Sequence, residues 1–220
     1  LHQTRAEILS HWKGCAYANA SRNAIFATLL AERGLTGPAP IFEGENGFFK
    51  VVLNGEYELD KFGGNGVPFK ISECTIKRFP LGLYSQTVVQ AALETRDQMP
   101  NFNVDDVKSV NIRTLGRAIN IMANDEEKWH PKTRETADHS MPYTTAVALT
   151  YGFVNQSHFD DEYINNQQLL ELTSRVTAEE SEEANRRVPE AMLCYMDIVT
   201  KSGEIYSSEV PYHKGHYKNP

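Results

Sequence analysis

The stretch W-H-P-K-T-R-E-T-A-D-H-S-M-P-Y, which runs from Trp129 to Tyr143, ends where an apolar segment begins. Pro142 suits the first turn of a helix and Gly152 suits the position just after its end, so we expect a helix between them. Side chains that carry positive charge or transfer protons gather just ahead of this rigid element: His130, Lys132, Arg134, His139 and Tyr143. Such a grouping suits an anionic substrate.

Towards the N-terminus, apolar residues recur at three- and four-residue spacings over residues 18–33 and then stop at a glycine, which predicts a helix. Lys13 and Gly14 fall in the turn that we expect before it, where backbone N–H groups and the helix dipole favour a negative ligand. Residues 41–68 are rich in glycine and aromatic residues and predict a connection dominated by loops. We therefore expect a domain boundary near residue 70.

The middle of the chain mixes strand and helix patterns. Phe69–Phe79 has the composition of a strand, which would place Lys77 at a strand-to-helix corner, and Ser85 can cap the helix that follows. Residues 107–113 alternate between apolar and polar and predict a strand, with a short helix expected over residues 115–122.

Near the C-terminus, alternate apolar residues over positions 192–198 predict a strand. Residues 201–204 can turn the chain into a second strand that ends at Val210. Helices thus come first, and strands and helices are mixed afterwards, so the order favours an α+β fold over an alternating parallel sheet.

Composition narrows the class of protein. The chain has 220 residues, is 40% hydrophobic and 23% charged, and has no apolar run near the ~20 residues that cross a bilayer. A net charge of -7 repels nucleic acid and anionic metabolites at long range, so an anionic ligand requires a local cationic pocket. The first residues resemble neither a secretory signal nor a transit peptide, and the three cysteines, Cys15, Cys74 and Cys194, form no disulfide framework. We expect a cytoplasmic protein that binds neither nucleic acid nor membrane.

Metal and nucleophile motifs are weak. His213 and His216 lie three residues apart, but we interpret them as surface residues of a loop. Cys15 has no obvious histidine partner in the sequence, and neither a P-loop nor a dinucleotide fingerprint is present. We expect no metal and no cofactor.

Several motifs together resemble the MmgE/PrpD family, and their order and spacing match across nearly all of the chain. They are W-K-G-C-A at 12–16, K-R-F-P at 77–80, T-R-E-T-A-D-H-S-M-P-Y at 133–143, G-H at 215–216 and K-N-P at 218–220. The family includes 2-methylcitrate dehydratases, cis-aconitate decarboxylases and an iminodisuccinate epimerase, which all act at carbon next to a carboxylate. The resemblance implies a di- or tricarboxylate substrate.

The resemblance also implies a fold and a set of partners. Residues 1–70 would be the last part of a large all-helical domain, residues 71–212 a smaller α+β domain with a mostly antiparallel sheet, and residues 213–220 a return segment towards the helical domain. Family chains are about twice as long and usually form homodimers, so we expect a homodimer and a missing N-terminal helical portion that contributes to the site.

Site residues are carried over position by position. Lys13 and Lys77 would bind substrate carboxylates and stabilise the enolate-like species that forms when a proton leaves carbon. His139 would be an acid or base, with a helix-capping or packing histidine as the alternative interpretation. The other expected substrate-binding residues are Arg78, Ser85, Gln86, Arg117 and Tyr143.

Two positions help to choose among activities. Gly82 stands where the resemblance implies a catalytic histidine in decarboxylases, and Arg117 stands where it implies a tyrosine, so decarboxylation is disfavoured. The favoured function is a metal-independent hydro-lyase that acts on 2-methylcitrate or a related tricarboxylate, in the methylcitrate cycle of propionate catabolism. The alternatives are an isomerase, epimerase or decarboxylase of a small di- or tricarboxylate, and a catalytically incomplete structural fragment.

Overall fold

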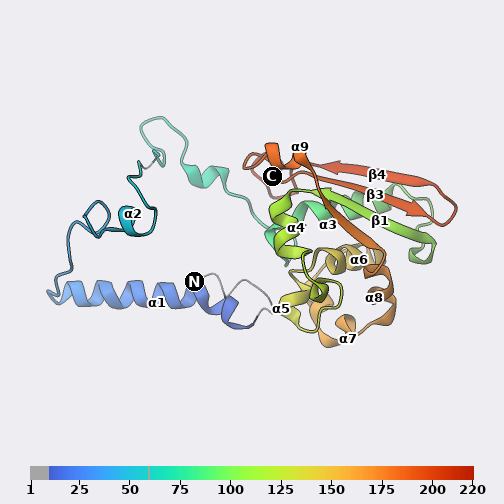
Figure 1. The fold of residues 1–220 in the computed structure, drawn as a ribbon, viewed down its shortest axis with the longest axis horizontal. Helices are drawn as coiled ribbons and strands as arrows, with labels where there is room; N and C mark the ends of the chain where they lie inside the picture. The colour runs from blue at the N-terminus through green and yellow to red at the C-terminus, as the bar shows by residue number, and fades with distance from the viewer. Residues whose placement is uncertain (1–9, 59) are drawn as a thin grey trace. The chain divides into compact units, whose positions relative to one another are not determined.

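A computed structural model describes residues 10–58 and 60–220 of the chain (Figure 1). The chain divides into two compact units, one of which spans His11–Ser72, while the other contains Glu73–Pro220. Each unit is described by itself below.

The His11–Ser72 unit is built on one long helix, α1 (Trp12–Glu32), followed by turns and the short helix α2 (Phe48–Val51). The predicted helix is confirmed, but it begins six residues earlier than the pattern indicated. Lys13 and Gly14 therefore lie within its first turn and not in a turn before it. No residue of α1 is buried.

The segment Phe69–Phe79 is not a strand, contrary to the prediction from its composition. Residues Lys70–Glu73 form a 3-10 helix (η2), and the chain then runs irregularly to residue 82. A strand composition stabilises a strand only where a neighbouring strand supplies a hydrogen-bonded ladder. Here Ile76 makes one backbone hydrogen bond to the loop residue Gly215 and the segment joins no sheet, so Lys77 lies in an irregular segment.

The Glu73–Pro220 unit contains a four-stranded sheet with the strand order β2-β1-β3-β4. The strands are β1 (Val107–Thr114), β2 (Val176–Glu180), β3 (Cys194–Thr200) and β4 (Ile205–Val210). The β3–β4 hairpin confirms the prediction, and β3 alternates between buried and half-buried residues along its length. The unit is α+β, as expected from the order of the elements.

The sheet is mixed and not mostly antiparallel, which corrects the expectation. Strand β1 pairs antiparallel with β3, where Ile112 faces Met196, but pairs parallel with β2, where Ile112 faces Ala178. Parallel neighbours need a long crossover connection, and residues 115–175 supply one with several helices.

The helices of this unit cover the sheet and build the core (Figure 1). Helix α3 (Gln86–Asp97) lies against β3 and β4, and α6 (Met141–Tyr151) packs against α3 and against α8 (Gln167–Thr173). The remaining helices are α4 (Gly116–Met122), α5 (Arg134–Ala137), α7 (Asp161–Ile164) and α9 (Glu182–Arg186), and the short 3-10 helices are η3 (Leu83–Ser85), η4 (Val104–Asp106), η5 (Glu126–Lys128) and η6 (Gln156–Phe159).

Helix α6 has the ends that the sequence predicts. The Ser140 hydroxyl accepts a hydrogen bond from the Tyr143 N–H at 3.0 Å, Pro142 lies in the first turn, and Gly152 ends the helix with a left-handed φ of 73°. Residues 141–149 of the helix are all buried. Its N-terminus is therefore a fixed point in the middle of the core. In the part of the chain that the structure describes, no helix combines the length and apolar character that crossing a bilayer requires.

Candidate active site

His139 lies in the short link between α5 and α6, and the local backbone fixes its position. Its N–H donates to the Thr136 carbonyl at 3.1 Å, and the N–H of Ser140 donates to the Ala137 carbonyl at 3.1 Å. The Thr133 hydroxyl caps α5 by accepting from the Thr136 N–H at 3.2 Å. Caps on both neighbouring helices thus hold the residue between them.

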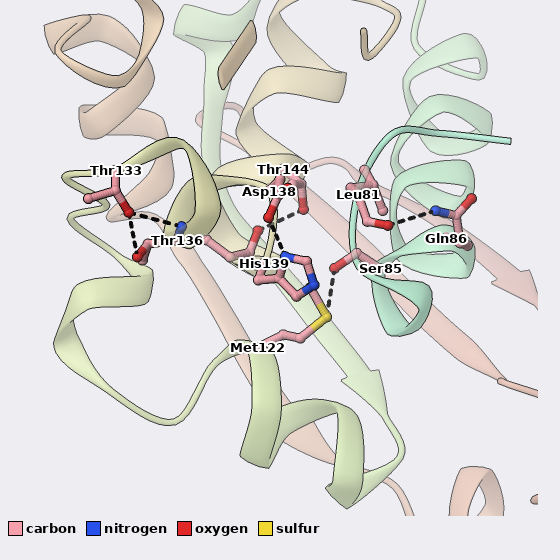
Figure 2. Close-up of polar contacts among 10 residues, drawn as sticks. Leu81, Ser85, Gln86, Met122, Thr133, Thr136, Asp138, His139 and Thr144 are labelled. Atoms are coloured by element: carbon pink, nitrogen blue, oxygen red, sulfur yellow. Dashed lines mark hydrogen bonds and ion pairs between the residues drawn. The ribbon is translucent and has the colours of Figure 1, made fainter. Parts of the chain in front are cut away.

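A carboxylate orients the imidazole ring. Nδ1 of His139 contacts the carboxylate of Asp138, and the two side chains are 18% and 27% exposed (Figure 2). Figure 2 shows the opposite edge of the ring turned towards Met122 and Ser85. A half-buried histidine that is oriented by a carboxylate is an arrangement that suits general acid–base chemistry.

Gly82 lies directly against this ring. Its N–H donates to the Asp138 carbonyl at 2.9 Å. A Cβ at position 82 would lie 2.5 Å from Cε of Met122 and 3.3 Å from Cδ2 of His139, so the side chain of Met122 fills the space where one from position 82 would start. The loop that carries Lys77 and Arg78 therefore reaches the histidine at Gly82.

Ser85 precedes α3, as predicted, but its side chain does not cap the helix. The buried hydroxyl donates to Sδ of Met122 at 3.4 Å (Figure 2). Ser85 thus helps to hold Met122, whose side chain lies next to Gly82. This contact differs from the capping role that the sequence indicated.

Gln86 was expected to bind substrate, but its amide is committed to the backbone of the preceding loop. Oε1 accepts from the N–H groups of Arg78 at 3.0 Å and Phe79 at 3.1 Å, while Nε2 donates to the Phe79 carbonyl at 2.9 Å. The residue is fully buried. Gln86 therefore stabilises the backbone of the loop that carries Lys77.

The side chain of Tyr143 likewise bonds to the protein backbone. The side chain is fully buried on α6, and its hydroxyl donates to the His158 carbonyl at 2.7 Å. Burial raises the pKa of the Tyr143 phenol well above its usual value, so the group stays protonated. A substrate-binding role does not fit a hydroxyl that is buried in the core and already bonded to a backbone carbonyl.

The cationic candidates are exposed or half-exposed. Lys77 and Arg78 are exposed in the irregular segment, and Arg78 stacks over the Phe79 ring at 5.2 Å. Arg117 is exposed at the start of α4 and lines a pocket of about 370 Å³ together with Tyr84, Leu115, Asn185, Val188, Pro189, Ala191 and Met192. Lys13 is half-exposed on α1 and belongs to the other unit. The structure thus brings the Lys77–Gly82 loop, Ser85, Gln86 and His139 together within one unit.

His213 and His216 are buried, which corrects their interpretation as surface residues. Burial lowers the pKa of both imidazoles, and the nearby carbonyl of Ile76 opposes this shift at His213 only in part. The spacing of two histidines in a C-terminal loop gave no signal of this burial, because the loop acquires its partners only through tertiary contacts. Among the described residues, no three His, Cys, Asp or Glu side chains gather where they could hold a metal ion.

The Glu73–Pro220 unit is an α+β domain in which the Asp138–His139 pair lies next to the end of the loop that carries Lys77 and Arg78. The chain belongs to the MmgE/PrpD family: the model of the MmgE/PrpD C-terminal domain matches residues 79–220, and the model of the N-terminal domain matches residues 1–60. The family that the sequence motifs indicate is therefore confirmed.

Individual relatives cover most of this chain. The 2-methylcitrate dehydratase of Salmonella typhimurium is 28% identical over 176 residues, which are 76% of this chain and 35% of that protein. The probable 2-methylcitrate dehydratase of Saccharomyces cerevisiae is 26% identical over 225 residues, or 93% of this chain and 41% of the relative. The cis-aconitate decarboxylase of Mus musculus is 23% identical over 209 residues, or 92% of this chain and 41% of the relative. The chain therefore spans between a third and a half of the length of these relatives.

Proposed function

We propose that this chain contributes the small domain, and part of the helical domain, of a hydro-lyase that dehydrates 2-methylcitrate or a related tricarboxylate. The observation that carries the proposal is the half-buried His139, which Asp138 orients and which lies against the loop that bears Lys77. The family and the 2-methylcitrate dehydratases among its relatives support the same chemistry.

In the proposed reaction a C–H bond next to a carboxylate breaks, and its electron pair forms the C=C bond. The C–O bond at the neighbouring carbon breaks, and the departing hydroxide receives a proton and leaves as water. His139 would transfer one of these protons, because an imidazole changes its charge near neutral pH. Lys77 and Lys13 would bind carboxylates and stabilise the negative charge that develops when the proton leaves carbon.

The surroundings of Gly82 support dehydration over decarboxylation. The resemblance places a catalytic histidine of the decarboxylases at this position, but here Met122 and the His139 ring occupy the space around the glycine. A side chain would have to displace the end of Met122, which Ser85 contacts. The position is thus packed for glycine and supplies no second imidazole.

The proposal includes groups beyond the Glu73–Pro220 unit. Lys13 would face the same substrate as Lys77, and the additional helical portion of the longer relatives would complete the pocket, with a homodimer as the proposed assembly. The exposed apolar side chains of α1, such as Ile25, Phe26 and Leu29, are consistent with a helix that packs against further helical structure.

Kinetics with the polypeptide in its native length test the proposal. We expect 2-methylcitrate to yield the ultraviolet absorbance of a conjugated alkene, and His139→Gln to lower kcat about 100-fold or more. His130→Gln is the matched control, because His130 lies in the same stretch but is exposed, and it should retain wild-type activity. Equal activities of the two variants would overturn the role of His139. Deuterium uptake from solvent into recovered substrate without alkene formation would favour an epimerase.

A further inference from the structure

The backbone on both sides of Lys77 is anchored to the same helix, although the lysine side chain itself is exposed. We infer that Gln86 and the C-terminal segment Tyr212–Pro220 are positioning elements that hold the backbone at Lys77 in a fixed place. The inference rests on the proposed function only in giving Lys77 a substrate to bind. The anchoring itself is a separate structural claim.

The first anchor is Gly215, which lies in the C-terminal segment. Its carbonyl accepts a hydrogen bond from the Ile76 N–H at 2.8 Å, one residue before Lys77. Gly215 has a left-handed φ of 96°, and a Cβ at this position would collide with the Ile76 carbonyl oxygen. The approach of the two backbones therefore requires glycine at this point.

The C-terminal segment that carries Gly215 is itself well fixed. The Gly215 N–H donates to the Asn219 carbonyl at 2.8 Å, and the Asn219 side chain donates to the Tyr212 carbonyl at 2.9 Å. The ammonium of Lys218 contacts the carboxylate of Glu190. Buried His213 completes the packing of the segment. These contacts tie down the segment that carries Gly215.

The second anchor is Gln86, which binds the backbone directly after Lys77. Its Oε1 accepts from the N–H groups of Arg78 and Phe79. Figure 2 shows its Nε2 directed to the carbonyl of Leu81, at 3.5 Å, so the amide spans the loop from one end to the other. A buried amide that bonds only backbone groups fixes loop shape and leaves no group for a ligand.

Both anchors lead back to α3. Gln86 is the first residue of this helix, and Gln90 lies one turn later on it. Oε1 of Gln90 accepts from the Lys214 N–H at 2.6 Å, next to Gly215. Residues four apart on a helix lie on one face, so a single face of α3 holds both sides of the Lys77 loop.

This arrangement distinguishes Lys77 from an ordinary surface lysine. A solvated lysine on a mobile loop loses backbone and side-chain entropy when it binds an anion, and the loss weakens binding. At Lys77 the neighbouring backbone is already ordered, so less entropy remains to be lost. An exposed cation on a fixed backbone is suited to hold a substrate carboxylate.

Hydrogen exchange of individual amides tests the anchoring without substrate. We expect Gly215→Ala to speed exchange of the Ile76 amide about tenfold or more, because the added methyl group breaks its hydrogen bond. Gly203→Ala is the matched control: Gly203 also has a left-handed φ, of 94°, but a Cβ there would meet no described atom within 4 Å. Unchanged protection of Ile76 in Gly215→Ala would overturn the anchoring. If that variant does not fold, Gln90→Ala should produce a smaller acceleration at Ile76, and its absence would be equally decisive.

Kinetics in two backgrounds separate positioning from general destabilisation. In the native-length protein, Gly215→Ala should lower kcat/KM for the tricarboxylate about tenfold, and in a Lys77→Ala background it should have no further effect. An equal loss in both backgrounds would show a merely structural role and overturn the inference. A wild-type protein without hydro-lyase activity, together with the expected exchange pattern, would support the anchoring and overturn the proposed function.

Discussion

The two units of the chain differ in how much of their own structure they stabilise. Every residue of the hydrophobic core cluster lies between Phe79 and Val210, in the Glu73–Pro220 unit, whereas α1 of the other unit buries none of its residues. The Glu73–Pro220 unit can therefore fix its functional groups by packing, as the caps and contacts around His139 show. The His11–Ser72 unit presents Lys13 on a helix whose apolar side chains remain exposed, so the orientation of this lysine depends on further contacts.

The largest expected effect comes from separating the units. A polypeptide of residues 73–220 should unfold in a single cooperative transition, because it contains the complete core cluster. A polypeptide of residues 11–72 should show no cooperative transition, since an isolated helix whose apolar side chains are exposed is marginal in water. Circular dichroism during heating measures both, and a cooperative transition of the 11–72 polypeptide would break the comparison.

Truncation of one leucine in each unit sharpens the contrast. Leu149→Ala on α6 should lower the free energy of unfolding by about 2–5 kcal/mol, because the side chain is fully buried and its removal leaves a cavity. Leu29→Ala on α1 should change it by about 0.5 kcal/mol or less, because that side chain is 54% exposed. Denaturant titration of the two variants compares them, and similar losses would mean that α1 is packed in solution.

Two serines that precede helices of the Glu73–Pro220 unit should differ in how much they stabilise it. Ser140→Ala should cost about 1–2 kcal/mol, because its hydroxyl caps α6 and also donates to the Lys128 carbonyl. Ser85→Ala should cost about 0.5 kcal/mol or less, because its hydroxyl contacts only the weakly accepting sulfur of Met122. Thermal unfolding of both variants provides the measurement. Equal losses would indicate that Ser85 caps α3 after all.

The smallest effect concerns pH. Burial lowers the pKa of His213 below its ordinary value of 6.5, so the folded protein holds it neutral while the unfolded chain takes up a proton. The contribution of neutral His213 to the free energy of unfolding is present above pH 6.5 and is lost as the pH falls below that value. His158 and His216 act in the same direction.

His213→Asn should therefore make the free energy of unfolding less dependent on pH below 6.5 than it is in the wild-type protein. Denaturant titrations at several pH values would detect the difference. A variant with an unchanged slope would show that His213 is protonated in the folded state.

Sequence patterns predicted the elements that depend on local chemistry. Pro142 and Gly152 marked the ends of α6, and the alternation before Thr200 marked β3, because caps and side-chain periodicity act over a few residues. Sequence patterns failed where tertiary partners decide. The segment Phe69–Phe79 has the composition of a strand but pairs with no strand of the sheet. The parallel pairing of β1 with β2 depends on a long crossover connection.

The candidate site was predictable to a similar extent. His139 and Gly82 were identified by position, and the structure places them in contact. Gln86 and Tyr143 carry polar groups that look available in the sequence, but the fold uses them for backbone carbonyl and N–H groups. No local pattern indicates whether a polar group will be satisfied by the protein itself, because the partners are distant in sequence.

A crystal structure of the native-length protein with 2-methylcitrate tests the central claim most directly. We expect the ammonium groups of Lys13 and Lys77 to lie within hydrogen-bond distance of carboxylates of one ligand, with the His139 imidazole next to its reacting carbons. A ligand that contacts neither lysine, or the two ammonium groups on opposite outer surfaces, would contradict the account.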